Sequence, residues 1–221
     1  KEEMENFTYT ISHNMGTPLT VMKLNAQMLL SKNKDNADLQ KKLNGIVGEI
    51  DGMAEMMRDV LLLSRAKSQE IQLEKTPTEN VIAKINSDAK MSYGTPETQI
   101  IVKDCPEVLA DKTLLYQVFL NVITNAVKYS SQQEKPLVEI DGESIDDEVV
   151  YKISDNGIGI HKGQDEKMFK IFSRMDNAKN FKGNGVGLSI VHRIMLRLGG
   201  SISYESAPNQ GTTFILKFKK P

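Results

Sequence analysis

The sequence has little cysteine, no excess of either charge and no long apolar run. Its 221 residues contain one cysteine, Cys105, which excludes an internal disulfide and indicates a reducing compartment. The formal net charge of -1 provides neither the basic excess typical of nucleic-acid binding nor an acidic tail. No apolar stretch is long enough to cross a bilayer, and no secretory signal is recognisable. These absences favour a globular protein of one or two domains that binds no nucleic acid.

The chain begins at Lys1, inside an apparently helical pattern, and not at a methionine. We therefore expect a cytoplasmic fragment of a longer protein. The fragment itself has no membrane segment, but the full-length protein could be membrane-anchored through a missing N-terminal sensor.

The first part of the chain, residues 1–68, has the apolar spacing of a helical bundle. Over 39–64 the apolar residues recur at alternating steps of four and three, and a looser version covers 4–29. The polar stretch SKNKDNAD between them predicts a turn, with Asp38 as the N-cap of the second helix. We expect an antiparallel helical hairpin, two copies of which form a dimeric four-helix bundle.

The remainder mixes helices and strands. Helices are predicted over about 79–91, 111–130 (with Asp111 as N-cap) and 165–172, and within 183–200, where a loop enters a longer helix that stops at Gly199–Gly200. Strands are predicted within 98–104, 107–111, 137–144, 147–155, 201–206 and 212–220. This order predicts an α/β sandwich with a mixed sheet. The whole chain is thus α+β, with domains at 1–68 and 77–221 and a linker at 69–76.

Two glycine-rich stretches, DNGIGI (155–160) and GNGVGL (183–188), stand out in the second domain. Each alone could be a tight turn, but together they suggest a nucleotide clamp, the second at the start of a helix. No GK[ST] follows, so a Walker loop is excluded. On the helix 111–130, Asn121, Asn125 and Lys128 share one face, either solvated or facing phosphate and Mg²⁺.

At this point the ordered motifs resemble those of the sensor histidine kinases. The stretches that carry the resemblance are FTYTISHNMGTPLT, VLLLSRA, NVITNAVKYS, DNGIGI, MFKIFSRM, GNGVGLSIVHRIMLRLGG and NQGTTFILKF. They cover essentially the whole chain in the family's order and spacing. The resemblance implies a histidine-kinase/gyrase-type ATPase fold in the second domain.

The resemblance also implies the site. Asp155 corresponds to the carboxylate that accepts the adenine amino group, Asn125 to the Mg²⁺ ligand and Lys128 to a phosphate contact, while residues 173–182 form a lid. The residues implied to bind ATP are Asn121, Asn125, Lys128, Tyr129, Asp155, Gly157, Gly159, Arg174, Gly183, Gly185, Gly187, Leu188 and Thr213.

The implied reaction is phosphorylation of His13 by ATP, followed by transfer to an aspartate on the receiver domain of a response regulator. Thr17 matches a residue that positions water for dephosphorylating the regulator, so phosphatase activity is also implied. The family usually has an acid after the histidine, but this chain has Asn14, which cannot accept a proton at neutral pH.

Two alternatives stay open. Asn14 and Gly16 raise the possibility of a degenerate, non-catalytic scaffold that binds nucleotide and a partner. The other alternative is a water-activating ATPase. Gln117 stands where related ATPases carry a glutamate, and the hairpin bearing His13 argues against this function.

Overall fold

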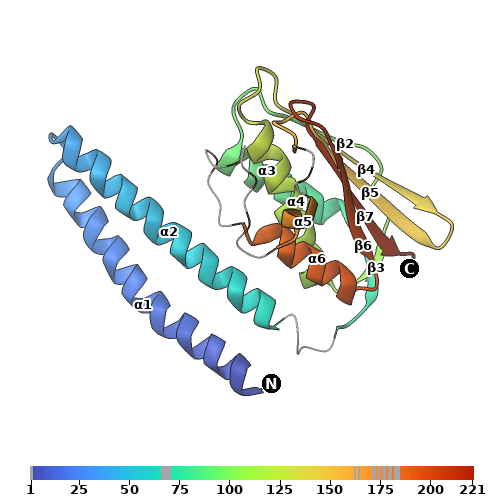
Figure 1. Ribbon diagram of the computed structural model, residues 1–221, viewed down its shortest axis with the longest axis horizontal. Coiled ribbons are helices and arrows are strands. Elements are labelled where there is room, and N and C mark those ends of the chain that lie inside the picture. The colour runs from blue at the N-terminus through green and yellow to red at the C-terminus, as the bar shows by residue number, and fades with distance from the viewer. Residues whose placement is uncertain are drawn as a thin grey trace. The chain divides into compact units, whose positions relative to one another are not determined.

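The computed structural model comprises two compact units, Lys1–Gln69 and Glu70–Pro221 (Figure 1). The residues that the structure describes are 2–65, 71–161, 163, 165–170, 173, 175, 178, 181 and 185–221. Within these ranges no helix has the length and apolar character needed to span a membrane.

The first unit is a hairpin of two long helices, α1 (Glu2–Lys32) and α2 (Ala37–Arg65), joined by a short polar turn (Figure 1). Their pairing includes an ion pair between Lys23 Nζ and Asp51 Oδ1 at 2.7 Å. The predicted hairpin is therefore present, and its turn falls within the predicted stretch 31–38.

The N-cap of α2 is Asn36, so the prediction of Asp38 was wrong. The Asn36 Oδ1 accepts a hydrogen bond from the Leu39 N–H at 3.0 Å, and its carbonyl accepts from the Gln40 N–H at 2.9 Å. Asp38 lies inside the first turn, where its carboxylate pairs with Lys42 Nζ at 2.7 Å. Both side chains suit a cap. The helix simply begins two residues earlier than its apolar pattern indicates.

The hairpin buries only alternate positions of the predicted apolar seam. The buried positions are Leu19, Ala26, Leu43 and Ile50. The exposed positions between them are Met15, Met22, Leu29, Ile46 and Met53. Most of both sets line one apolar groove along the hairpin. One half of the seam therefore joins the two helices, and the other half has no cover within the described part of this unit.

The second unit is built from strands and helices in mixed order. Its elements are β1 (Glu74–Thr76), α3 (Glu79–Tyr93), β2 (Gln99–Val102), β3 (Val108–Ala110), α4 (Lys112–Ser130), β4 (Leu137–Ile145), β5 (Glu148–Asp155), α5 (Asp165–Met168), α6 (Gly187–Arg197), β6 (Ser201–Ser206) and β7 (Thr212–Lys219). The predicted helix at 165–172 is shorter in the structure, and residues 171 and 172 lie outside the described ranges.

Five strands form the main sheet, in the order β2-β4-β5-β7-β6. β2 runs parallel to β4, and every other neighbouring pair is antiparallel, so the sheet is mixed. Helices α3, α4 and α6 lie on one side of it (Figure 1). A helical hairpin followed by this sandwich is the two-domain α+β fold that the sequence predicts.

Helix α4 is held against the sheet by one fully apolar face. The ring of Phe119 lies edge-on to Tyr151 of β5 at 5.1 Å between centroids, and 6.0 Å from Phe218 of β7. All three side chains are almost fully buried, which stabilises the domain by removing large apolar areas from water. The opposite face of α4 is left for the polar residues of the site.

Residues 74–76 were expected in the linker, but they form β1, which pairs antiparallel with β3. The Thr76 hydroxyl donates to the Ala110 carbonyl at 2.9 Å, so the strand is fastened to the second unit. The other limits of the predicted domains stay predictions.

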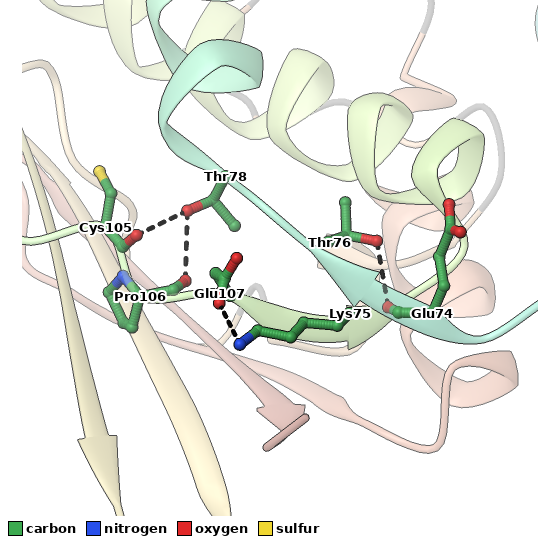
Figure 2. A network of polar contacts seen from close by, with 7 residues as sticks. All are labelled: Glu74, Lys75, Thr76, Thr78, Cys105, Pro106 and Glu107. Atoms are coloured by element: carbon green, nitrogen blue, oxygen red, sulfur yellow. Dashed lines mark hydrogen bonds and ion pairs between the residues drawn. The ribbon is translucent and has the colours of Figure 1, made fainter.

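A buried hydroxyl network fixes the start of α3. The Thr78 Oγ1 lies 3.1 Å from the Cys105 carbonyl oxygen and 3.2 Å from that of Pro106 (Figure 2). It also lies 2.6 Å from the Tyr151 hydroxyl, which itself donates to the Pro106 carbonyl at 2.7 Å. Burial raises the pKa of Tyr151 well above its usual range. The network therefore ties the loop before β3 to both α3 and the central strand β5.

The first prediction concerns the cap of α4. Asp111 Oδ1 accepts hydrogen bonds from the N–H groups of Thr113 and Leu114, at 2.9 and 3.1 Å. Replacing Asp111 with Ala leaves these donors without that partner, and we expect the free energy of unfolding of the second unit to fall by about 0.5–2 kcal/mol. Asp111→Asn keeps the acceptor and should cost much less. Equal losses for both variants in urea denaturation would contradict the capping role.

Candidate nucleotide site

The polar face of α4 presents two amides and an ammonium group. Asn121, Asn125 and Lys128 are half-buried on this face. The Asn121 Nδ2 donates to the carbonyl of Gln117 at 2.8 Å, and the Lys128 Nζ donates to the Asn125 Oδ1 at 3.1 Å. The structure thus brings together the three polar residues that the sequence places on one face.

Two aromatic rings accompany the lysine. The Lys128 Nζ lies 4.4 Å from the centroid of the Tyr129 ring, within the range of a cation–π contact. The Tyr129 ring meets Phe181 edge-on at 5.2 Å between centroids, and Phe181 is buried. Phe181 lies in the predicted lid over 173–182, and sequence reasoning did not single it out.

Asp155 ends β5 as a buried carboxylate, 9% exposed. Its Oδ1 accepts a hydrogen bond from the Gly157 N–H at 2.8 Å, and the backbone of Thr212 also bonds to it. Burial outweighs these two hydrogen bonds and raises the pKa of Asp155 to about 7. Buried carboxyl groups with a raised pKa are common in binding sites.

Glycines allow two segments to approach α4 closely. A Cβ on Gly157, after β5, would lie 2.4 Å from the Tyr129 carbonyl oxygen at the end of α4. A Cβ on Gly187, at the start of α6, would lie 2.5 Å from the Asn121 Oδ1. A side chain at 157 would push two main-chain segments apart, and one at 187 would displace the Asn121 side chain. The α4 face, the turn after β5 and the first turn of α6 therefore converge because these residues have no side chain.

Other glycine positions are explained by backbone conformation. Gly159 and Gly185 have φ of 61° and 69°, which L side chains rarely adopt. Gly159 also approaches the Ala207 carbonyl too closely to carry a Cβ. Leu188 is half-buried in the first turn of α6. Arg174 and Gly183, two further predicted site residues, lie outside the described residues.

Thr213 is not beside Asp155, and its neighbour Thr212 takes that place. β5 and β7 pair in register Asp155↔Thr212 and Ser154↔Thr213. Because side chains alternate along a strand, Thr213 faces away from the helices and its hydroxyl lies 2.9 Å from Ser154 Oγ. Thr212 is buried on the helix side. The alternation of apolar residues at 214, 216 and 218 could have selected Thr212 from sequence.

In the first unit, His13 and Asn14 lie in α1, and their side chains are outside the described part of the structure. Thr17, one turn later, is exposed. The helix continues through Pro18, and the Thr20 hydroxyl donates to the Gly16 carbonyl at 2.9 Å. The roles assigned to His13, Asn14 and Thr17 stay predictions.

The donor set of the second unit fits a phosphorylated ligand with a divalent cation. Asn125 offers a neutral oxygen, which is a hard ligand suited to Mg²⁺. Lys128 supplies a positive charge for phosphate, and the glycine-lined start of α6 supplies backbone amides. The buried carboxylate of Asp155 can accept hydrogen bonds from a polar group of the ligand.

Comparisons with known proteins agree with this geometry. Residues 110–221 match the family model of the histidine kinase-, DNA gyrase B- and HSP90-like ATPases, and residues 3–69 match the His Kinase A phosphoacceptor domain. The chain therefore belongs to the histidine kinases, and it is the catalytic core of a protein-histidine kinase of the sensor class.

Individual relatives are similar over nearly the whole chain. It is 31% identical over 214 residues to the phytochrome-like protein Cph1 of Synechocystis sp., covering 96% of this chain and 28% of that protein. It is 29% identical over 218 residues to the sensor-like histidine kinase SenX3 of Mycolicibacterium smegmatis, covering 96% of this chain and 56% of that protein. The chain thus spans only about a quarter to a half of these relatives.

Solved structures share the fold. Full-length ShkA, in complex with AMPPNP, has a TM-score of 0.71 at 24% identity and covers 98% of this chain and 46% of that one. The mycobacterial sensor histidine kinase MprB has a TM-score of 0.60 at 25% identity, covering 67% of this chain and 99% of that one.

The second prediction follows from the raised pKa of Asp155, which is about 7 in the folded protein against an ordinary value of 3.8. Between these values the folded state binds a proton more tightly than the unfolded state. The stability contributed by Asp155 is therefore present at low pH and is lost as the pH rises through about 7. Asp155→Asn removes this dependence.

In the nucleotide-free protein, we expect Asp155→Asn to raise the melting temperature relative to wild type more at pH 8 than at pH 5. Differential scanning fluorimetry across this pH range measures the melting temperature of both proteins. The effects of the other titrating groups cancel when the wild-type value is subtracted from that of the variant. A difference in melting temperature that stays constant with pH would show that burial does not raise the pKa of Asp155.

Proposed function

We propose that this protein phosphorylates itself on His13 with the γ-phosphate of ATP and then passes the phosphate to an aspartate of a response regulator receiver domain. The observation that carries the proposal is the close approach of two predicted motifs to a third on α4: the motif that begins with the buried carboxylate of Asp155 at the end of β5, and the start of α6. The match of residues 3–69 to the phosphoacceptor domain supports His13 as the acceptor.

Each residue of the site has a distinct proposed role. Asp155 accepts a hydrogen bond from the adenine amino group, which is why it is buried yet retains an unshared oxygen lone pair. Lys128 binds phosphate oxygens, and Asn125 holds Mg²⁺. Asn121, one turn earlier on the same face, also contacts the nucleotide. When bound, Mg²⁺ neutralises negative charge on the phosphate groups. Tyr129 lies beside the nucleotide, and Arg174 contacts the γ-phosphate.

In the transfer step, the imidazole of His13 attacks the γ-phosphorus in line, a nitrogen–phosphorus bond forms, and the bond to the β-phosphate oxygen breaks with release of ADP. A neutral imidazole is a competent nucleophile near pH 7 because its ordinary pKa is about 6.5. Asn14 holds the ring in one tautomer by hydrogen bonding, since an amide cannot take up the proton. The proton on the other ring nitrogen is released to water when the nitrogen–phosphorus bond has formed. Thr17, which is exposed on α1, positions water for regulator dephosphorylation.

We also propose that two copies of the hairpin form the active dimer. Four exposed residues of the apolar seam line a groove that a second hairpin would cover: Met22, Leu29, Ile46 and Met53. Burying such a row is favourable at roughly 25 cal/mol per Å² of apolar area. A four-helix bundle is the arrangement that satisfies both halves of the seam. Because ATP is an intracellular substrate, we place both units in the cytoplasm.

The third prediction tests the phosphoacceptor. Incubation with γ-labelled ATP and Mg²⁺ should give a label that is labile in acid and stable in hydroxide, and His13→Gln should abolish it. His161→Gln, a change at an exposed histidine after β5, serves as the matched control and should keep the label.

Two variants of the nucleotide site, Asn125→Asp and Asp155→Asn, should also lose labelling. Nucleotide binding without any label in wild type would instead favour the non-catalytic scaffold. Steady release of inorganic phosphate without label would favour a water-activating ATPase. Full labelling of either site variant would contradict the site assignment.

The fourth prediction concerns Asn14. Replacing it with Glu supplies a carboxylate that can accept the imidazole proton, so the single-turnover rate of His13 labelling at pH 7 should rise. General bases contribute roughly 10²–10⁴-fold where they act fully, and we expect a gain of about 10-fold here. Asn14→Gln, which lengthens the side chain without adding a base, is the control. An unchanged rate in Asn14→Glu would show that the missing base does not limit this protein.

A further inference from the structure

Lys128 is bound to the oxygen that the proposed function assigns to the metal. Its Nζ donates to the Asn125 Oδ1 at 3.1 Å while lying 4.4 Å from the centroid of the Tyr129 ring. The three residues belong to one turn of α4, and all are half-buried. The ammonium group is therefore held from two sides, by an amide oxygen and by an aromatic face.

The Tyr129 ring and its main chain each have a close neighbour. Phe181 packs edge-on against the ring at 5.2 Å, and the main chain of Gly157 lies so close to the Tyr129 carbonyl that a Cβ there would be 2.4 Å away. The ring that supports the lysine is therefore itself packed against a buried aromatic side chain.

An ammonium group and a divalent cation repel each other strongly when both contact one oxygen, more so in a half-buried site than in water. The Asn125 amide oxygen has two lone pairs, and Lys128 donates to it at 3.1 Å. A metal ion on the same oxygen would lie next to the ammonium group, and the repulsion between the two charges favours movement of Lys128 away from it. The released ammonium group then becomes available to phosphate oxygens on the same side of α4.

We propose that Lys128 and Mg²⁺ exclude each other from the Asn125 Oδ1, and that Tyr129 is the positioning residue that holds Lys128 there before the metal arrives. This inference rests on the proposed function, because it takes the Mg²⁺–nucleotide complex as the ligand. It adds that metal binding and the movement of Lys128 are a single coupled event. Lys128 thus competes with Mg²⁺ for the Asn125 Oδ1.

The experiment measures how much Mg²⁺ is needed to strengthen ADP binding. ADP affinity is followed by calorimetry over a Mg²⁺ titration that starts from a metal-free chelator buffer, so no turnover is involved. Lys128→Met keeps most of the side-chain length and removes the charge, and Tyr129→Leu removes the ring that supports the lysine. Both should lower the half-saturating Mg²⁺ concentration about 3- to 10-fold. Lys128→Met should also weaken ADP binding at saturating Mg²⁺, where the displaced ammonium group of the wild type contacts phosphate.

Two matched variants serve as controls. Tyr129→Phe keeps the aromatic face and should restore the wild-type Mg²⁺ requirement. Lys112→Met removes an exposed lysine at the opposite end of α4 and should change neither quantity. Melting temperatures of all variants establish that they are folded, and the Tyr129 pair gives a second route to the answer if Lys128→Met does not fold.

The outcomes separate this inference from the proposed function. If wild type binds ADP more tightly with Mg²⁺ but neither Lys128→Met nor Tyr129→Leu lowers the half-saturating concentration, mutual exclusion is wrong and the proposed function stands. A decrease confined to Lys128→Met overturns the positioning role of Tyr129. If wild type binds no nucleotide in either buffer, the proposed function fails, and this inference fails with it.

Discussion

The packing of α4 on the sheet is the constraint on which the rest of the second unit depends. Phe119 and its apolar neighbours leave only one rotation of this helix about its axis, because the rings of Tyr151 and Phe218 surround it. That rotation directs Asn121, Asn125 and Lys128 away from the sheet. The glycines after β5 and at the start of α6 then approach the main chain of Tyr129 and the side chain of Asn121 on the same helix. A change in the core that rotated α4 would therefore move all three of its polar site residues together.

The site places groups of opposite charge near the apolar core of the domain: a carboxyl group at the end of β5 and an ammonium group on α4. Asp155 is buried and accepts hydrogen bonds from the backbone of Gly157 and Thr212, and burial disfavours its charged form. Lys128 is half-buried, and its ammonium group contacts an amide oxygen and an aromatic face. The first arrangement costs stability when the carboxyl group is charged, whereas the second is favourable.

Much of this could be predicted from sequence, because the long elements have strong periodicity. The hairpin, α4 and the positions of most strands along the chain follow from apolar spacing, and the motif order indicates the family. The errors fall where neighbouring residues share the same chemistry. Asn36 and Asp38 are equally good caps, so only the hydrogen bonds decide between them. The contact of Phe181 with Tyr129 joins segments far apart in the chain, and no local pattern encodes it.

The register of β5 against β7 has a consequence for folding fidelity. Asp155 faces the helices because it pairs with Thr212, and a slip of one residue would turn it toward the opposite face and bring Ser154 inward. A chain with slipped strands could still be compact, but it would have no carboxylate in the site. With the role proposed for Asp155, nucleotide binding would stabilise the native pairing over a slipped one. The ligand of such a site would then also select among sheet registers.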